Sequence, residues 1–170
     1  MRVTSAVVVA MVLALAAGCR REAPINGIGG FEIGKTQLGQ LSGRCMPDEQ
    51  EPLMRCPLGV SAPLGEQKGD MELYFGGKNT DSTLVEILLD VTRCDPANLE
   101  AYLVSVLGQP GGRTDKRVWW MNEYVYISAL VRAGASSCEV NFVAVTDKER
   151  IQVLGGQAGQ TGQAGNAPTK

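Results

Sequence analysis

The chain has 170 residues, of which 16 are lysine or arginine, 18 are aspartate or glutamate and none is histidine. This length fits a single domain, and 44% apolar residues can form a core. A net charge of −2 provides no basic surface for nucleic acid, and the lack of histidine excludes Ser-His-Asp and Cys-His catalysis as well as histidine-ligated metal sites.

The first 18 residues have the pattern of an export signal. Arg2 precedes an uninterrupted apolar run over 6–17, which is too short to span a bilayer as a helix. The run leads into Leu15-Ala16-Ala17-Gly18-Cys19, which resembles the lipobox of bacterial lipoproteins, where the cysteine is acylated and becomes the first mature residue. The alternative is an ordinary secretory signal that is cleaved nearby and leaves Cys19 as a free thiol.

The lipobox resemblance implies a periplasm-facing lipoprotein whose N-terminal acyl chains, palmitate among them, anchor it firmly. Arg20, and not Asp, follows Cys19. By resemblance to the sorting rule of Gram-negative lipoproteins, this favours the outer membrane over the inner one.

Four cysteines remain once Cys19 is assigned to lipid: Cys45, Cys56, Cys94 and Cys138. An even number in an oxidising compartment predicts two disulfides, for which three pairings are possible. Proximity in sequence favours Cys45 with Cys56, which leaves Cys94 with Cys138. Because the chain has no Cys-x-x-Cys pair and no histidine, we expect no metal site and no cofactor.

Composition divides the mature chain into three parts. Residues 19–27 are expected to form a tether, 28–153 a single folded domain and 154–170 a tail. From Gly155 onward Gly, Gln and Ala dominate, and such a segment cannot offset the entropy lost on ordering. We therefore expect the tail to be disordered.

The first half of the domain contains a short expected helix that starts at Thr36, with Leu38 and Leu41 facing inward. Two strands are expected over 70–75 and 83–92, because both are apolar and flank the turn sequence GGKNTD.

The clearest element is a helix that begins at Asp95-Pro96. Asp95 is a good N-cap, proline is tolerated at the first helical position, and Gly108 followed by Pro110 ends the helix. The apolar side chains that share one of its faces are Leu99, Tyr102, Leu103, Val106 and Leu107. Three strands rich in Val, Ile, Tyr and Trp are expected next, over 117–121, 123–132 and 137–146.

This order of elements predicts an α+β fold, an antiparallel sheet with helices packed on one face. Each half opens with a helix and continues as a meander, which is the pattern of two tandem helix-plus-meander repeats.

Two short motifs resemble a known family. Gly30-Phe31-Glu32-Ile33-Gly34-Lys35-Thr36 resembles the F-x-x-G-x-T opening of small envelope lipoproteins related to BamE (SmpA/OmlA). Leu107-Gly108-Gln109-Pro110, followed by Trp119-Trp120, resembles their L-G-x-P … W passage from helix to strand. Tandem versions occur in β-lactamase-inhibitor-like folds. The resemblance covers most of 30–145 and implies a binding or assembly module.

The segment GGFEIGKT over 29–36 also satisfies the G-x-x-x-x-G-K-T pattern of a phosphate-binding P-loop. A buried strand must precede that loop and a firm helix must follow it, but PINGI and QLGQLSG stand there instead. We therefore expect a turn and a helix N-cap at Gly34–Thr36, and nucleotide binding is only a remote alternative.

The aromatic side chains indicate a surface for a partner. Alternation along the strand over 123–132 sends Val125 and Ile127 to one face and Tyr124 and Tyr126 to the other. The candidate partner-binding residues are Trp119, Trp120, Tyr124, Tyr126 and Tyr74. Protein interfaces favour Tyr and Trp. The alternative is that the tail, a loop or the other half of the chain covers this face.

The sequence contains no pairing of carboxylates for acid–base work and no G-x-S-x-G elbow, so we do not expect an enzyme or a small-molecule substrate. The expected function is protein binding in the periplasm, as an accessory subunit of an envelope assembly machine. An inhibitor or immunity protein against a secreted toxin or hydrolase is the alternative, and a structural link between membrane and cell wall is a third.

Overall fold

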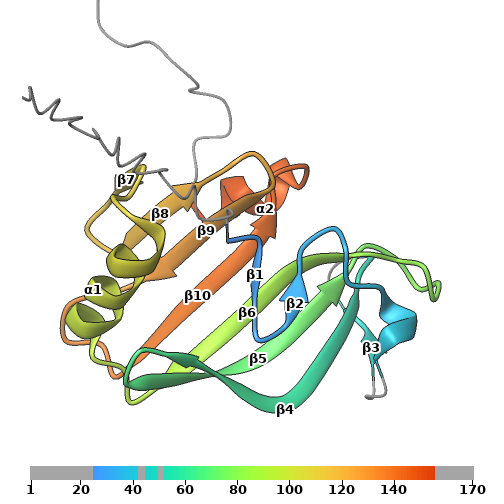
Figure 1. The fold of residues 1–170 in the computed structure, drawn as a ribbon, viewed down its shortest axis with the longest axis horizontal. Helices are drawn as coiled ribbons and strands as arrows, with labels where there is room; N and C mark the ends of the chain where they lie inside the picture. The colour runs from blue at the N-terminus through green and yellow to red at the C-terminus, as the bar shows by residue number, and fades with distance from the viewer. Residues whose placement is uncertain (1–24, 42–44, 50–51, 156–170) are drawn as a thin grey trace, which may run out of the picture.

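The computed structural model describes residues 25–41, 45–49 and 52–155 (Figure 1). The predicted signal peptide (1–18), the predicted acylation site Cys19 and residues 156–170 of the predicted tail lie outside the described residues. Within the described part of the chain, no helix is both long and apolar enough to cross a membrane.

The described residues form an antiparallel sheet of eight strands in the order β3-β4-β5-β6-β10-β9-β8-β7. These strands are β3 (Met46–Pro47), β4 (Met54–Leu64), β5 (Gln67–Phe75), β6 (Leu84–Thr92), β7 (Gly112–Arg113), β8 (Arg117–Met121), β9 (Val125–Leu130) and β10 (Ser137–Ala144). The other elements are the hairpin of β1 (Gly27–Ile28) and β2 (Phe31–Glu32), the 3₁₀ turn η1 (Leu38–Gln40) and the helices α1 (Pro96–Leu107) and α2 (Lys148–Val153).

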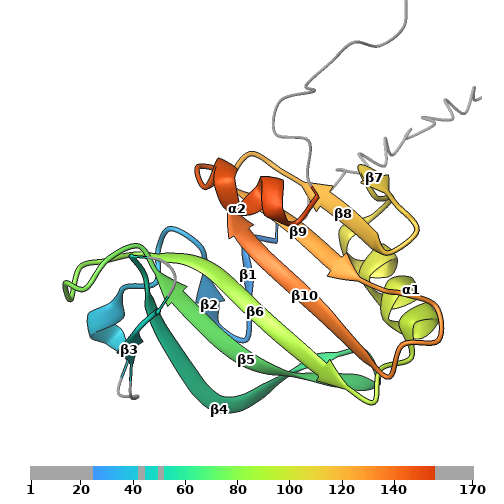
Figure 2. The ribbon, with the colours of Figure 1, turned by 180° about the vertical axis from the view of Figure 1, so that it is seen from behind.

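The predicted antiparallel sheet is confirmed, but of the two predicted helices only α1 forms as a full helix, and α2, which was not predicted, lies on the other side of the sheet. Leu99 and Leu103 of α1 belong to the main core, and the Trp120 indole of β8 donates a hydrogen bond to the Gly108 carbonyl just after α1. Ile151 of α2 instead packs against Tyr126, whose side chain points to the opposite side of β9. Figures 1 and 2 show the two helices on opposite sides of the sheet. We call these sides the α1 face and the α2 face.

The helix predicted from Thr36 is replaced by the single 3₁₀ turn η1. The backbone N–H groups of Leu38 and Gly39 donate to the carbonyls of Ser82 and Thr80 instead of closing helical turns. A side chain at position 39 would stand 2.9 Å from the Thr80 carbonyl oxygen, so glycine allows this close approach.

Strand β4 was not predicted, because Pro57, Gly59 and Pro63 are strand breakers. Its only neighbour over most of its length is β5, since β3 pairs with Met54 and Arg55 alone. Proline is tolerated on such a strand because its missing N–H faces no partner. Gly59, with a φ of 66°, lies in the bulge between Pro57 and Ser61. With β4, each half of the sheet has a short edge strand and a three-stranded meander, and β6 and β10 join the halves.

The folded domain extends slightly beyond both predicted boundaries. The Asn26 carbonyl accepts a hydrogen bond from Ile33, and Asn122 donates to the Ile25 carbonyl, so residues 25–27 are part of the domain and not of the tether. At the other end, Leu154 is 3% exposed and packs with α2, although it was assigned to the tail.

Two disulfides join the four cysteines in the pairing that sequence proximity favours. Cys45 is bonded to Cys56 of β4, and Cys94, just before α1, is bonded to Cys138 of β10. The sequence separations are 11 and 44 residues, so the second bond closes the longer loop and ties α1 to the middle of the sheet.

Replacing Cys94 and Cys138 together with alanine should lower the free energy of unfolding by about 4 kcal/mol, and replacing Cys45 and Cys56 by about 3 kcal/mol. The difference arises because a longer loop restrains the unfolded chain more. Denaturant unfolding of the two double variants beside the wild type measures both values. Alkylation of any of the four cysteines in the unreduced protein would contradict the pairing.

Candidate functional site

The α2 face of the sheet is the candidate functional surface. Among the described elements, only α2 lies over it, and β4, β5 and β6 are uncovered in Figure 2. The strand register places Glu72, Leu88, Asn141, Ser128 and Trp119 in one row across this face. The next row contains Arg55, Tyr74, Glu86, Val143 and Tyr126.

An ion pair with a tyrosine occupies the β4–β5 side of this face. Arg55 Nε donates to Glu72 Oε2 over 2.9 Å, its Nη2 donates to Oε1, and the Tyr74 hydroxyl donates to Oε2 over 3.0 Å. The hydrogen bond from Arg55 lowers the pKa of Glu72, whereas burial and the Glu72 carboxylate raise the pKa of Tyr74 to about 12. Arg55 therefore stays ionised against Glu72 at neutral pH, and the three side chains hold one arrangement.

A second polar cluster crosses β8, β9 and β10. Arg117 donates to Ser128 Oγ and to Glu139 Oε1, both over 3.1 Å, and Asn141 Nδ2 donates to the same Glu139 oxygen over 2.7 Å. Ser128 and Asn141 are fully buried, while Arg117 and Glu139 remain partly exposed. This cluster is preorganised, because a single carboxylate oxygen accepts from two fixed donors.

Helix α2 is held on the sheet by one strong contact. Both Arg150 Nε and Nη2 donate to the carboxylate of Glu86 on β6, each over 2.9 Å, and Glu86 is 2% exposed. Asp147 caps the helix by accepting from the Arg150 N–H over 3.0 Å. Ile151 and Leu154 cover Tyr126 and Val143, so this corner of the α2 face is closed.

The structure divides the five predicted aromatic residues. Tyr126 is 2% exposed beneath α2, and burial raises the pKa of its hydroxyl. Trp120 points to the α1 face and is 5% exposed, so neither residue can contact a partner on the α2 face as predicted. Alternation along β9 is correct, but the covering helix was not foreseen. Tyr74 and Trp119 do lie half-buried on the α2 face, and Tyr124 is exposed in the turn after β8.

The open part of the α2 face therefore combines Tyr74, Leu88 and Trp119 with Arg55 and Arg117. Neither arginine was predicted as a site residue, because the carboxylate partners Glu72 and Glu139 are distant in sequence. Opposite charges that stand 17 and 22 residues apart in the sequence leave no local pattern.

The P-loop match has neither of the elements that phosphate binding needs. Gly29 and Gly30 form the turn of the β1–β2 hairpin, and η1 follows the segment instead of a helix. Lys35 donates to Glu32 over 2.6 Å, and the Thr36 hydroxyl accepts from the Glu32 N–H over 2.9 Å. The segment is a closed turn, with its lysine paired to a carboxylate.

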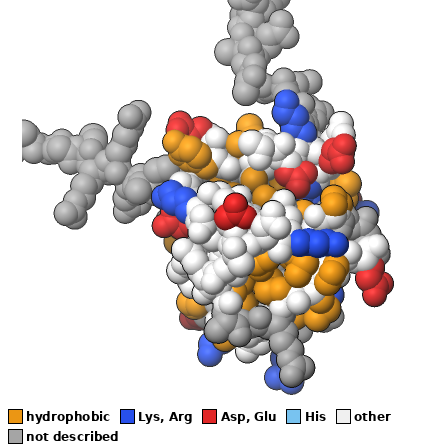
Figure 3. Space-filling view, turned by 90° about the vertical axis from the view of Figure 1, so that its right-hand side faces the viewer, with side chains coloured by type: hydrophobic (Ala, Val, Ile, Leu, Met, Phe, Trp, Pro, Cys, Tyr) orange, Lys and Arg blue, Asp and Glu red, His pale blue; other side chains and the backbone are white. Residues whose placement is uncertain are grey.

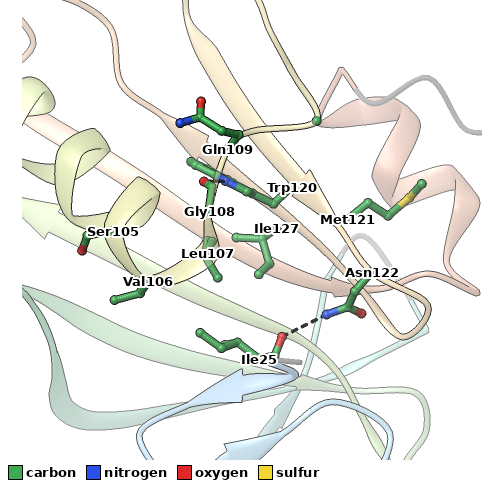
Figure 4. A pocket seen from close by; sticks show the side chains of 11 residues that line it. Ile25, Ser105, Val106, Leu107, Gly108, Gln109, Trp120, Met121, Asn122 and Ile127 are labelled. Atoms are coloured by element: carbon green, nitrogen blue, oxygen red, sulfur yellow. Dashed lines mark hydrogen bonds between the residues drawn. The ribbon is translucent and has the colours of Figure 1, made fainter. Parts of the chain in front are cut away.

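A groove of about 600 Å³ lies on the α1 face, between the end of α1 and the turn from β8 to β9 (Figure 4). Ile25, Val106, Leu107, Trp120 and Ile127 supply its apolar lining, and Asn122 bonds Ile25 across it. The Met121 side chain, opposite Tyr126, points away from the groove to the α2 side. Seen from the end that carries β3 and η1, charged side chains of both signs are interspersed (Figure 3). In the described parts of the chain, no cluster of residues could hold a metal ion.

Tyr126→Ala should lower the free energy of unfolding by about 3–5 kcal/mol, as truncation of a buried aromatic does. Tyr74→Ala should cost only about 1 kcal/mol, because its hydroxyl loses one hydrogen bond at a partly exposed site. Thermal melts with Leu103→Ala as the core control measure the effects. A Tyr126→Ala protein that melts like the wild type would mean that α2 is not seated on this side chain.

No protein-family model matches the chain, and no curated protein or solved structure is similar enough to count as a match. The resemblance to the BamE-related lipoproteins stays a prediction that rests on the motifs at 30–36, 107–110 and 119–120.

Proposed function

We propose that this protein is a lipid-anchored protein of the outer membrane that binds another envelope protein through the open part of its α2 face. The observation that carries the proposal is that Leu88 lies on β6 between the two arginine–carboxylate clusters, with Tyr74 in the first cluster and Trp119 beside the second. Aromatic residues and arginine are enriched where proteins bind proteins, and charged groups that are already paired lose little entropy on binding.

The shape of the face also favours a protein over a small molecule as the partner. The row from Glu72 to Trp119 extends across five strands of a continuous sheet, and the groove described above opens on the other face. Small-molecule sites are concave, whereas protein partners bind extended surfaces.

The tandem organisation belongs to the same proposal. Each half of the sheet has one short edge strand followed by a three-stranded meander, and the last strands of the two halves pair. Two copies of one unit would produce this order. A full helix precedes only the second meander, because η1 occupies the equivalent place in the first.

The anchor can be tested by Cys19→Ser. We expect the wild type to need detergent for extraction and its N-terminal peptide to carry the mass of acyl chains, whereas the variant should be exported as a soluble protein. Unchanged fractionation of the variant, with no lipid mass on the wild-type peptide, would exclude the lipoprotein assignment.

Partner binding can be tested by photocrosslinking in intact cells. A photoreactive phenylalanine analogue at Tyr74 should give a specific crosslinked species, and the same analogue at Ala101, exposed on α1, should not. Leu88→Asp should reduce the Tyr74 crosslink at least tenfold, since a carboxylate would be desolvated at the interface, while the melting temperature stays near that of the wild type. Crosslinking from Ala101 but not from Tyr74 would refute the proposal. The partner's identity distinguishes an assembly subunit from an inhibitor or immunity protein.

A further inference from the structure

Three carboxylates form a row across neighbouring strands of the α2 face. The strand register sets Asp90 of β6 directly opposite Asp70 of β5 on one side and Glu139 of β10 on the other. We call these three residues the acidic row. Asp70 and Asp90 are exposed, and Glu139 is half-buried. Helix α2 lies over the other end of β10, so the acidic row belongs to the open part of the face (Figure 2).

The acidic row costs the fold stability. Like charges directly opposite each other on neighbouring strands are destabilising. Arg117 offsets the charge of Glu139, and the Ser61 hydroxyl donates to Asp70 over 2.7 Å. The carboxylate of Asp90 forms no hydrogen bond or ion pair with any residue that the structure describes. The central member of the row therefore has no structural role that would explain why a charge stands there.

A buried amide beside the row also lacks a partner. Asn141 is fully buried, and its Nδ2 donates to Glu139 Oε1 over 2.7 Å, so its amide lies against one end of the acidic row. The other polar atom of this amide, Oδ1, has no hydrogen-bond partner in the described part of the chain. Buried acceptors are nearly always satisfied in native proteins. Carboxylates and an unused acceptor side by side point to a donor from outside the chain.

A lysine or arginine side chain fits this site better than a metal ion. The described residues contain no three carboxylates placed so that they could hold one ion. A guanidinium or ammonium group carries several donors and can bridge separate carboxylates. Leu88 lies two positions before Asp90 on the same face of β6, where the methylene stem of such a side chain can pack. Lys68, two positions before Asp70 on β5, forms no ion pair with the row.

We propose that the acidic row binds a basic segment of the partner protein, whose lysine or arginine side chains contact Asp70 and Asp90 with their stems over Leu88. The inference names the chemistry of the partner and rests on the proposed function. Complementary charges at an interface steer the encounter and fix the register of the two proteins. The repulsion within the row is relieved when the basic segment binds, so the same charges that weaken the free protein favour the complex.

The first measurement is the melting temperature of the purified protein. Asp90→Asn should raise it by about 1–4 °C, because the substitution removes repulsion between opposed carboxylates. Asp81→Asn is the matched control, since Asp81 is exposed in the turn before β6, at the opposite end of the strand from Asp90, and should leave the melting temperature unchanged. A lower melting temperature for Asp90→Asn would mean that this carboxylate stabilises the fold, and would overturn the proposal.

The second measurement is the crosslink from the photoreactive analogue at Tyr74 in intact cells. Asp70→Asn combined with Asp90→Asn should weaken it at least fivefold, whereas Asp90→Glu, which keeps the charge, and Asp81→Asn should preserve it. An undiminished crosslink in the double variant would overturn the basic segment and leave the proposed function standing. The absence of any crosslink from Tyr74 in the otherwise unchanged protein would overturn both.

Discussion

The pairing of β6 with β10 is the constraint on which the rest of the structure depends. It alone hydrogen-bonds the two halves of the described sheet, and its register sets Ile87 and Leu89 opposite Phe142 and Val140. These four side chains fill the α1 face, while the intervening positions supply Glu86, Leu88, Asn141 and Val143 to the α2 face. A slip of one residue would move the apolar set to the opposite side and bury the charges in the core. This register therefore decides which side chains form the main core and which form the surface that we propose for binding.

Helix α2 shows how the same face serves two purposes. Its Arg150 neutralises Glu86, a carboxylate that is almost fully buried, and removal of one partner would leave an uncompensated charge in a place that water hardly reaches. Beyond the helix, the carboxylates of Glu72 and Glu139 pair with arginines that remain partly exposed. On the α2 face, the polar residues under the helix therefore hold α2 on the sheet, whereas those outside it form a preorganised surface.

Local signals in the sequence were sufficient for much of the fold. Strand β8 and helix α1 were predicted at their observed bounds. The signals are local in both cases: a run of Val and Trp for β8, and an N-cap, a proline and a terminating glycine for α1. Strand β4 could not be predicted in this way, since its prolines are tolerated only because of its place beside the sheet edge. The burial of Tyr126 was equally hidden, because it depends on a six-residue helix that begins 22 positions later. Alternation along β9 gives the direction of a side chain, but it cannot say what packs above it.

The two ends of the sheet restrict how another protein can attach. Each outermost strand has only two residues. The part of β4 that does not pair with β3 is interrupted by Pro57, Pro63 and a bulge. A foreign strand that tried to extend the sheet would find few backbone donors in register, so edge-to-edge association and self-templated aggregation are both discouraged. The proposed partner would then be recognised by side chains on a face, so substitutions there would change the choice of partner without altering the backbone.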